Sequence, residues 1–169
     1  GWNTRLQNGE WVPTFPNARY LFAKKEVEYW QQMLASSLPD SVNHGSWADS
    51  VAPIFDAGQA VLVAADQEVS DGVALLPAPG HTPGHMAVII ASAGECAVIS
   101  GDVFNHPLFV TEPWRTFGAD LDHAQGIETR NALLDRIEAD GMRLIAEHFP
   151  EPGWGNVVRA EGKRWFQAL

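Results

Sequence analysis

Cysteine and long apolar runs are scarce in this sequence of 169 residues. The single cysteine, Cys96, excludes an internal disulfide, so nothing favours an oxidising compartment and we expect a cytoplasmic protein. Cys96 lies in the apolar run Cys-Ala-Val-Ile, which is typical of a small core residue rather than of a nucleophile. A membrane span needs about 20 consecutive apolar residues. Since no stretch approaches that length, we expect no membrane partner.

Positive charge is also scarce, with 11 Lys and Arg residues against 21 Asp and Glu residues and a formal net charge of -10. An acidic surface repels phosphate backbones, and no cluster of Lys and Arg interrupts it. The charge balance therefore excludes nucleic acid from the expected partners.

The sequence does have enough apolar material for one core, because 46% of its residues are hydrophobic. Its length is short for two domains, so we expect one domain over residues 1–169. The chain begins with Gly1-Trp2 rather than Met, which leads us to expect that Gly1 is not the natural start of the protein.

Hydrophobic spacing predicts three helices. The first covers residues 24–36, and a weaker one covers 47–56, where Pro53 limits it. The best helix begins at Asp122, which has N-cap spacing to Gln125, and it ends at Gly141. We expect its buried stripe to consist of Ile127, Leu133, Leu134 and Ile137.

Short runs rich in Val, Ile, Leu and Ala, separated by Gly, Asp and Pro, predict strands. The runs lie at residues 19–23, 60–65, 72–76, 86–91, 96–100, 142–146 and 156–160. The continuous apolar runs are expected to be covered on both faces, and Ser92-Ala-Gly94 predicts a hairpin. Residues 1–16 show no clear period and are expected to form an irregular loop. Strands, a long helix and a returning strand predict a layered α/β (α+β) fold.

Three of these strands deliver a potential metal ligand at or near their ends. His81 lies in Pro79-Gly-His-Thr-Pro-Gly-His85, Asp102 follows Val-Ile-Ser-Gly, and His148 follows Ala-Glu. Taken singly, each has a structural alternative: a turn that holds two histidines, an Asp that caps a helix, or a hydrogen-bonded His at a strand end. A rigid strand that carries one ligand to its tip is nevertheless how a scaffold aims ligands into a shared cleft. The order of all three predicts a metal site.

On these residues the chain resembles the C-terminal part of metallo-β-lactamase-fold hydrolases, in particular the branch of quorum-signal lactonases and methyl-parathion-type hydrolases. Gly80-His-Thr-Pro-Gly-His85 is similar to the third metal motif of that family, Ser100-Gly-Asp102 to the fourth, and residues 147–155 to the fifth. The resemblance implies an αββα sandwich. It also implies that His81 binds a first metal, His148 a second, and Asp102 both.

The resemblance further implies two divalent metal ions, with zinc as the expected metal, and a small-molecule substrate such as a lactone or ester, attacked by a hydroxide that bridges the metals. Asp102 is then also the catalytic residue. His85, Asn105 and His106 are expected to support the ligands or to line the substrate pocket, with a purely structural role as the alternative for His85. Five tryptophans either frame an apolar pocket or pack in the core and interfaces: Trp2, Trp11, Trp30, Trp47 and Trp114.

The sequence departs from the family in one respect, because the hallmark His-x-His-x-Asp-His cluster is absent. Gly1-Trp2-Asn3-Thr4 resembles the continuation of that cluster, so we expect the chain to be a C-terminal portion whose upstream segment is missing. Such a portion should bind metal weakly or not at all. It should associate with its missing N-terminal part or with a second copy as a homo-oligomer.

Two other functions stay open at this point. The first is a truncated, inactive chain with a structural or interaction role. The second is a redox or sulfur-transfer member of the same fold, because one fold hosts unrelated chemistries.

Overall fold

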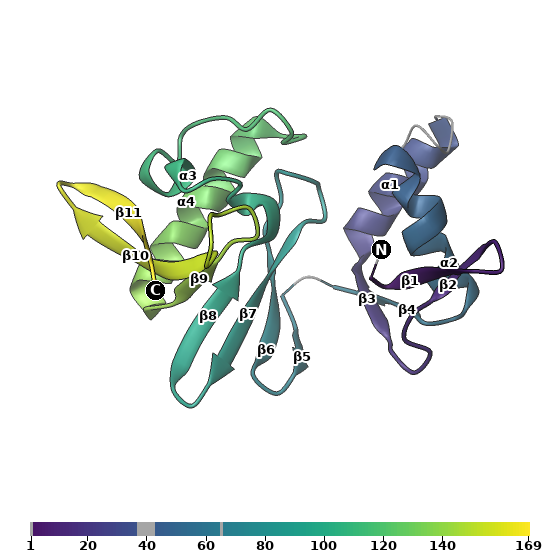
Figure 1. Ribbon diagram of the computed structural model, residues 1–169. Coiled ribbons are helices and arrows are strands. Elements are labelled where there is room, and N and C mark those ends of the chain that lie inside the picture. Colours follow the sequence, from purple (N-terminus) through teal and green to yellow (C-terminus); the bar gives the residue numbers. More distant parts are fainter. Residues whose placement is uncertain (1, 37–42, 65) are drawn as a thin grey trace. The chain divides into compact units, whose positions relative to one another are not determined.

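The computed structural model describes residues 2–36, 43–64 and 66–169 of the chain. These residues form two compact units, residues 1–64 (the N-unit) and residues 65–169 (the C-unit) (Figure 1). Among the described residues, no helix is both long enough and apolar enough to cross a membrane.

The N-unit opens with a hairpin of β1 (Thr4–Gln7) and β2 (Glu10–Pro13), so the prediction of an irregular loop was wrong. Asn8 and Gly9, at the tip, both have positive φ, of 54° and 87°. Two such residues make the type I′ turn whose twist matches the flanking strands. The Asn-Gly pair is the signal that the hydrophobic pattern alone did not show.

The remainder of the N-unit follows the predicted order. Strand β3 (Tyr20–Ala23) pairs in parallel with β4 (Ala60–Val63), and helix α1 (Lys24–Ser36) has the predicted bounds. The weaker helix divides into a π-helical turn η3 (Trp47–Val51) and α2 (Ala52–Asp56), with Pro53 in the first turn of α2. A 3₁₀ turn, η2 (Asn43–Gly45), precedes them.

The C-unit is built on one seven-stranded sheet with the order β11-β10-β9-β8-β7-β6-β5. All neighbouring strands in this sheet are antiparallel except β8 and β9, which are parallel. The strands are β5 (Glu68–Ser70), β6 (Val73–Pro77), β7 (Met86–Ser92), β8 (Glu95–Ile99), β9 (Arg143–Ile145), β10 (Trp154–Ala160) and β11 (Lys163–Ala168). The parallel connection from β8 to β9 contains η4 (Gly101–Val103), α3 (Leu108–Thr111) and α4 (His123–Asp140).

The predicted strands and the hairpin at Ser92-Ala-Gly94 are present, but β5 and β11 were missed. Strand β5 is three residues long and carries Glu68, and β11 begins with Lys163 and Arg164, so neither reads as an apolar run. The turn before β11, Glu161-Gly162, has φ values of 53° and 75°. Like Asn8-Gly9 in the first hairpin, it consists of two residues with positive φ.

Helix α4 packs its buried face on one side of the C-unit sheet, and this contact forms the core. Asp122 caps the helix by accepting a hydrogen bond from the Gln125 N–H, and Gly141 ends it in the left-handed conformation, as predicted. The predicted stripe is corrected at one position, since Ile127 is only half-buried whereas Arg130 is buried. The core comprises Ala78, Ala87, Val98, Val103, Phe104, Phe109, Val110, Leu133, Leu134, Ile137, Met142, Leu144, Ala146 and Phe149.

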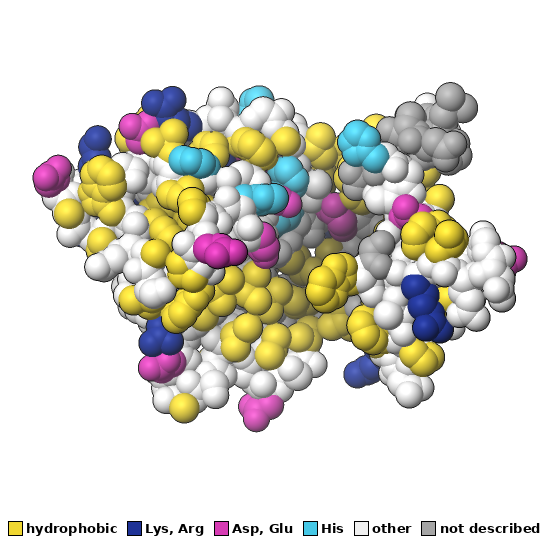
Figure 2. All heavy atoms as spheres, in the orientation of Figure 1, with side chains coloured by type: hydrophobic (Ala, Val, Ile, Leu, Met, Phe, Trp, Pro, Cys, Tyr) yellow, Lys and Arg dark blue, Asp and Glu magenta, His cyan; other side chains and the backbone are white. Residues whose placement is uncertain are grey.

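The opposite face of this sheet is apolar but incompletely covered, which corrects the expectation of burial on both faces. Alternation along β7 points Ile89 toward the core, and Ile90, which is 37% exposed, away from it. Figure 2 shows hydrophobic side chains gathered over these strands, below a group of histidines. Cys96 packs against the core, as predicted for a small apolar residue.

Candidate metal centre

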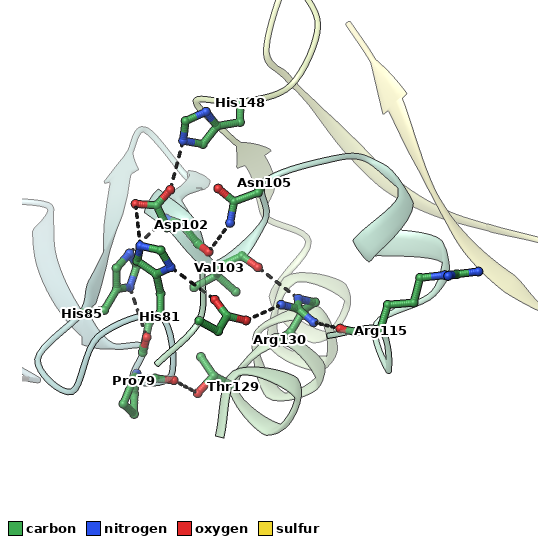
Figure 3. Close-up of polar contacts among 12 residues, drawn as sticks. Pro79, His81, His85, Asp102, Val103, Asn105, Arg115, Thr129, Arg130 and His148 are labelled. Carbon is green, nitrogen blue, oxygen red and sulfur yellow. Dashed lines mark hydrogen bonds and ion pairs between the residues drawn. The ribbon is translucent and has the colours of Figure 1, made fainter. Parts of the chain in front are cut away.

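The three predicted ligands lie at one edge of the C-unit sheet. Strands β6, β8 and β9 run in the same direction, because β7 is antiparallel to both β6 and β8 while β9 is parallel to β8. His81 follows β6, Asp102 follows β8 and His148 follows β9, so the carboxyl ends of three strands bring them together. Figure 3 shows the three side chains turned toward one another.

Asp102 is the centre of this group, and each of its carboxylate oxygens faces a different histidine. Oδ1 lies 3.0 Å from Nε2 of His148, and Oδ2 lies 3.6 Å from Nε2 of His81. The side chains are 36% exposed for Asp102, 23% for His81 and 56% for His148. The site is therefore open to solvent on the side of His148 and more enclosed on the side of His81.

The turn that carries Asp102 is built around His85. Its Nδ1 donates to the Ala78 carbonyl at 3.1 Å, and its Nε2 accepts the Asp102 backbone N–H at 3.0 Å. The tautomer follows from these partners. Both ring nitrogens point at backbone groups, so His85 holds the turn in place. Gly101, at φ 53°, is needed there, because a Cβ would lie 2.7 Å from His85 Nε2.

His81 is held from behind by groups of the segment 117–122. Its Nδ1 lies 3.2 Å from Oδ1 of Asp120, and its ring stacks on Phe117 at a centroid distance of 6.2 Å. The backbone N–H groups of Leu121 and Asp122 donate to the carbonyls of His81 and Gly80. A carboxylate on Nδ1 leaves Nε2 as the atom available toward Asp102, which is the usual arrangement of a metal-binding histidine.

Asp120 is itself fixed by Arg130, a buried residue of α4. The guanidinium lies 3.4 Å from Oδ2 of Asp120, and the two side chains are 1% and 2% exposed. Burial lowers the pKa of Arg130, and the charge of Asp120 and its hydrogen bond act in the opposite direction. The cation also stacks over the Phe109 ring, at 4.4 Å from the centroid.

The side chains of Asn105 and His106, which were also predicted for the site, form hydrogen bonds with backbone groups. Asn105 Nδ2 donates to the Asp102 carbonyl at 2.8 Å, so it supports the same turn as His85. His106 Nδ1 accepts the Leu108 N–H at 3.1 Å at the start of α3, and the side chain is exposed. Of the predicted tryptophans, Trp30 and Trp47 line a cavity of about 150 Å³ in the N-unit, and Trp2, Trp11 and Trp114 are exposed.

Sequence reasoning missed Asp120 and Arg130. A signal for Arg130 existed, because it lies at helical spacing from Leu133, Leu134 and Ile137 on the buried face of α4. An arginine on such a face needs a buried partner. Asp120 stands in a polar loop before the helix, and no local pattern distinguishes it from a solvated carboxylate.

A comparison with protein families matches residues 1–148 of the chain to the metallo-beta-lactamase superfamily. The chain belongs to this superfamily. The match includes His81, Asp102 and His148, and the mixed α/β sheet architecture agrees with the predicted fold class. A comparison with curated proteins gives no match.

Several solved structures of hydrolases share the fold of this chain. One is the hydrolase AbOPH, with a TM-score of 0.79 and 24% identity over 94% of this chain and 57% of that protein. The dizinc quorum-quenching lactonase AidC has a TM-score of 0.72 and 20% identity, with coverage of 93% and 56%. A probable metal-dependent hydrolase from Staphylococcus aureus has a TM-score of 0.70 and 16% identity, with coverage of 94% and 55%. The chain thus spans just over half of the length of these structures.

The side chains of His81, Asp102 and His148 are of the types that bind zinc, but they are too few for a complete site. Imidazole nitrogen and carboxylate oxygen both suit zinc, and the two oxygens of Asp102 face separate histidines. Within the described parts of the chain, however, no group of three or more His, Cys, Asp and Glu side chains could hold one ion. The predicted metal site is thus present only as His81, Asp102 and His148 placed close together.

Proposed function

We propose that this superfamily member is the C-terminal part of a dinuclear metal-dependent hydrolase that acts on a lactone, an ester or a related small molecule. The single observation that carries this proposal is the arrangement at Asp102, where each carboxylate oxygen faces the Nε2 atom of a different histidine. A carboxylate with one imidazole on each oxygen is the layout of a ligand shared by two ions. The dizinc lactonase AidC, which has a similar fold, supports zinc as the metal.

In this proposal His81 holds one ion, His148 holds the other, and Asp102 holds both. When bound, two divalent ions activate a water molecule and polarise the carbonyl or phosphoryl oxygen of the substrate. The residues of the chain itself set the geometry. His85 and Asn105 hold the turn of Asp102 through its backbone N–H and carbonyl, and Asp120 orients His81.

The open side of the site, at the more exposed His148, is where we place the substrate. The space behind His81, bordered by Asp120, Thr129 and Arg130, has a volume of about 10 Å³. That is no larger than one water molecule. The neighbouring AidC structure contains a product described as N-hexnoyl-L-homoserine, which supports a lactone as the first substrate to test.

The number of ligands limits what the chain does alone. Each ion would have one histidine and a share of Asp102, whereas zinc sites use three or four protein ligands. We therefore propose that further ligands come from an upstream segment. The same shortage favours the second candidate, an inactive chain with a structural or interaction role.

The test compares the 169-residue chain with a longer protein in which an upstream His-x-His-x-Asp-His segment is joined to it. We expect the chain alone to bind zinc weakly and to hydrolyse lactones and aryl esters poorly. The longer protein should hold two ions, and His81→Ala should lower its hydrolysis by more than the roughly 10–100-fold typical of changes outside the ligand set.

A matched control is His123→Ala, which removes an exposed histidine in the first turn of α4 and should leave hydrolysis unchanged. Stoichiometric binding of two ions by the 169-residue chain would contradict the proposed shortage of ligands. Full activity of the longer protein after His81→Ala would contradict the role of His81.

A further inference from the structure

We infer that Asp120 and Arg130 act together as a positioning pair for His81. Arg130 locks Asp120, and Asp120 keeps the imidazole proton of His81 on Nδ1, so that the lone pair of Nε2 faces Asp102. The inference rests on the proposed function in that Nε2 is taken as the metal-binding atom. The two residues are positioning residues, because neither lies beside the open face of the site.

The two oxygens of Asp120 have separate tasks. Oδ1 lies 3.2 Å from His81 Nδ1, and Oδ2 lies 3.4 Å from the Arg130 guanidinium. An ionised carboxylate only accepts hydrogen bonds, and Asp120 is paired with the Arg130 guanidinium. A neutral His81 ring then carries its proton on Nδ1, because only this nitrogen lies within hydrogen-bond distance of a carboxylate, whereas Nε2 lies 3.6 Å from Asp102 Oδ2 and is left unprotonated.

Arg130 also connects the segment of His81 to the segment of Asp102. Its Nε donates to the Val103 carbonyl at 3.1 Å, and one terminal nitrogen donates to the carbonyls of Pro113 and Arg115 at 3.0 and 2.9 Å. Val103 directly follows Asp102 in the chain. One buried cation thus contacts both segments, and Figure 3 shows its bonds to Val103 and Arg115.

The close packing of two glycines leaves Asp120 little freedom. A Cβ on Gly126 would lie 2.9 Å from Oδ2 of Asp120, and a Cβ on Gly80 would lie 2.4 Å from the Gly126 Cα. The turn before His81 and the first turns of α4 therefore approach as closely as backbone allows. Any larger residue at Gly126 must displace the carboxylate that holds His81.

The decisive variant is Asp120→Asn, which keeps the shape of the side chain. Arg130 can only donate, so the carboxamide oxygen must face it and the NH₂ group must face His81 Nδ1. His81 Nδ1 then accepts a hydrogen bond from the NH₂ group, and the ring proton moves to Nε2. We expect ¹⁵N NMR of the metal-free chain, at a pH where His81 is neutral, to show protonated Nδ1 in the unsubstituted protein and protonated Nε2 in the variant.

The matched control is Asp140→Asn, because Asp140 pairs with Arg136 on the exposed side of the same helix, α4. It should leave the His81 tautomer unchanged. An unsubstituted chain with protonated Nε2, or an Asp120→Asn chain that keeps protonated Nδ1, overturns the inference. Titration with Zn²⁺ of the longer protein, which carries the upstream ligands, separates it from the proposed function. If the tautomer changes as expected but Zn²⁺ shifts no signal of His81, the positioning pair stands and the metal role fails.

Asp120→Asn leaves Arg130 without its counter-charge, so its fold is checked by the dispersion of the NMR spectrum. If it does not fold, Gly126→Ala provides the test, since alanine favours the helix and acts on Asp120 only through its Cβ. We expect Gly126→Ala to give a mixture of His81 tautomers. A single protonated Nδ1 form in that folded variant also overturns the inference.

Discussion

At the scale of single residues, the candidate site depends on groups that bind backbone as much as on the three predicted ligands. His85 was expected to line the site or support it, and its two ring nitrogens hold the Ala78 carbonyl and the Asp102 N–H. The motif Gly80-His-Thr-Pro-Gly-His85 could therefore be interpreted from sequence as a rigid turn that presents His81 to the site. That His85 binds backbone depended on Gly101, which lies sixteen positions beyond His85 and is close to it only in the fold.

The first prediction concerns Gly101→Ala. Alanine at φ 53° is strained, and its Cβ would lie 2.7 Å from His85 Nε2, so the variant should lose about 2–3 kcal/mol in the free energy of unfolding. Urea denaturation measures the loss.

The matched control for this variant is Gly94→Ala, in the turn between β7 and β8. Gly94 has φ 82°, but nothing lies within 4 Å of the position that a Cβ would take, so the exchange carries the backbone cost without the clash. Equal losses in the two variants would show that His85 gives way freely and does not hold the turn.

At the scale of elements, hydrophobic spacing predicted the bounds of α1 and the strands that carry the candidate ligands, and cap residues predicted the start and end of α4. It succeeded there because each of these elements buries one face in a local core. It failed for β1, β2 and β11, whose partners are set by two-residue turns, and for Arg130, whose partners lie on segments far apart in sequence. Hydrophobic periodicity predicts which residues are buried, but it does not predict which groups a buried charge binds.

Helix α4 is tied to the last hairpin by Glu138, which receives hydrogen bonds from Arg159 and Arg164. The bond from Arg164 outweighs the opposing effect of burial and, with the bond from Arg159, holds the pKa of Glu138 below its usual value of 4.5. A lowered pKa means that the ion pairs stabilise the fold above that value and are lost as the pH falls through the folded-state pKa.

The second prediction follows from this sign. Glu138→Gln should lower the free energy of unfolding by about 1–2 kcal/mol at pH 7, and the gap to the unsubstituted chain should shrink below about pH 4.5. Urea denaturation at pH 7 and at pH 3.5 tests it. Glu128→Gln, on the same helix but away from the hairpin, is the control. A gap that stays constant with pH would show that Glu138 acts by packing rather than by charge.

At the scale of the whole molecule, the apolar outer face of the C-unit sheet still requires an explanation. Val88 and Ile90 alternate with the core residues Ala87 and Ile89, and Ile90 is 37% exposed. The sequence predicted that these runs are covered on both faces, and the exposure of Ile90 corrects this prediction for β7. The chain also spans only 57% of AbOPH, whose fold it shares.

The third prediction is therefore that the chain associates, either with a second copy or with an added N-terminal segment. Each 100 Å² of apolar surface left in water forfeits about 2.5 kcal/mol, which is a large part of a stability of about 5–15 kcal/mol. Light scattering should show a mass above that of one chain. Ile90→Thr should lower the associated fraction, whereas Leu169→Ser, at an exposed leucine outside the sheet, should not. A monomer at all concentrations would contradict self-association.

The parallel pairing of β8 with β9 also has a consequence for the order in which the molecule forms. Strands β6, β7 and β8 are joined by short connections and can pair within microseconds of meeting. Strand β9 is separated from β8 by α3 and α4, and His148 lies 46 positions beyond Asp102. Contacts at such separation form late in folding. We therefore expect His81, His85 and Asp102 to come together before His148 joins them, and under the proposed function a metal ion present during folding would meet His81 and Asp102 first.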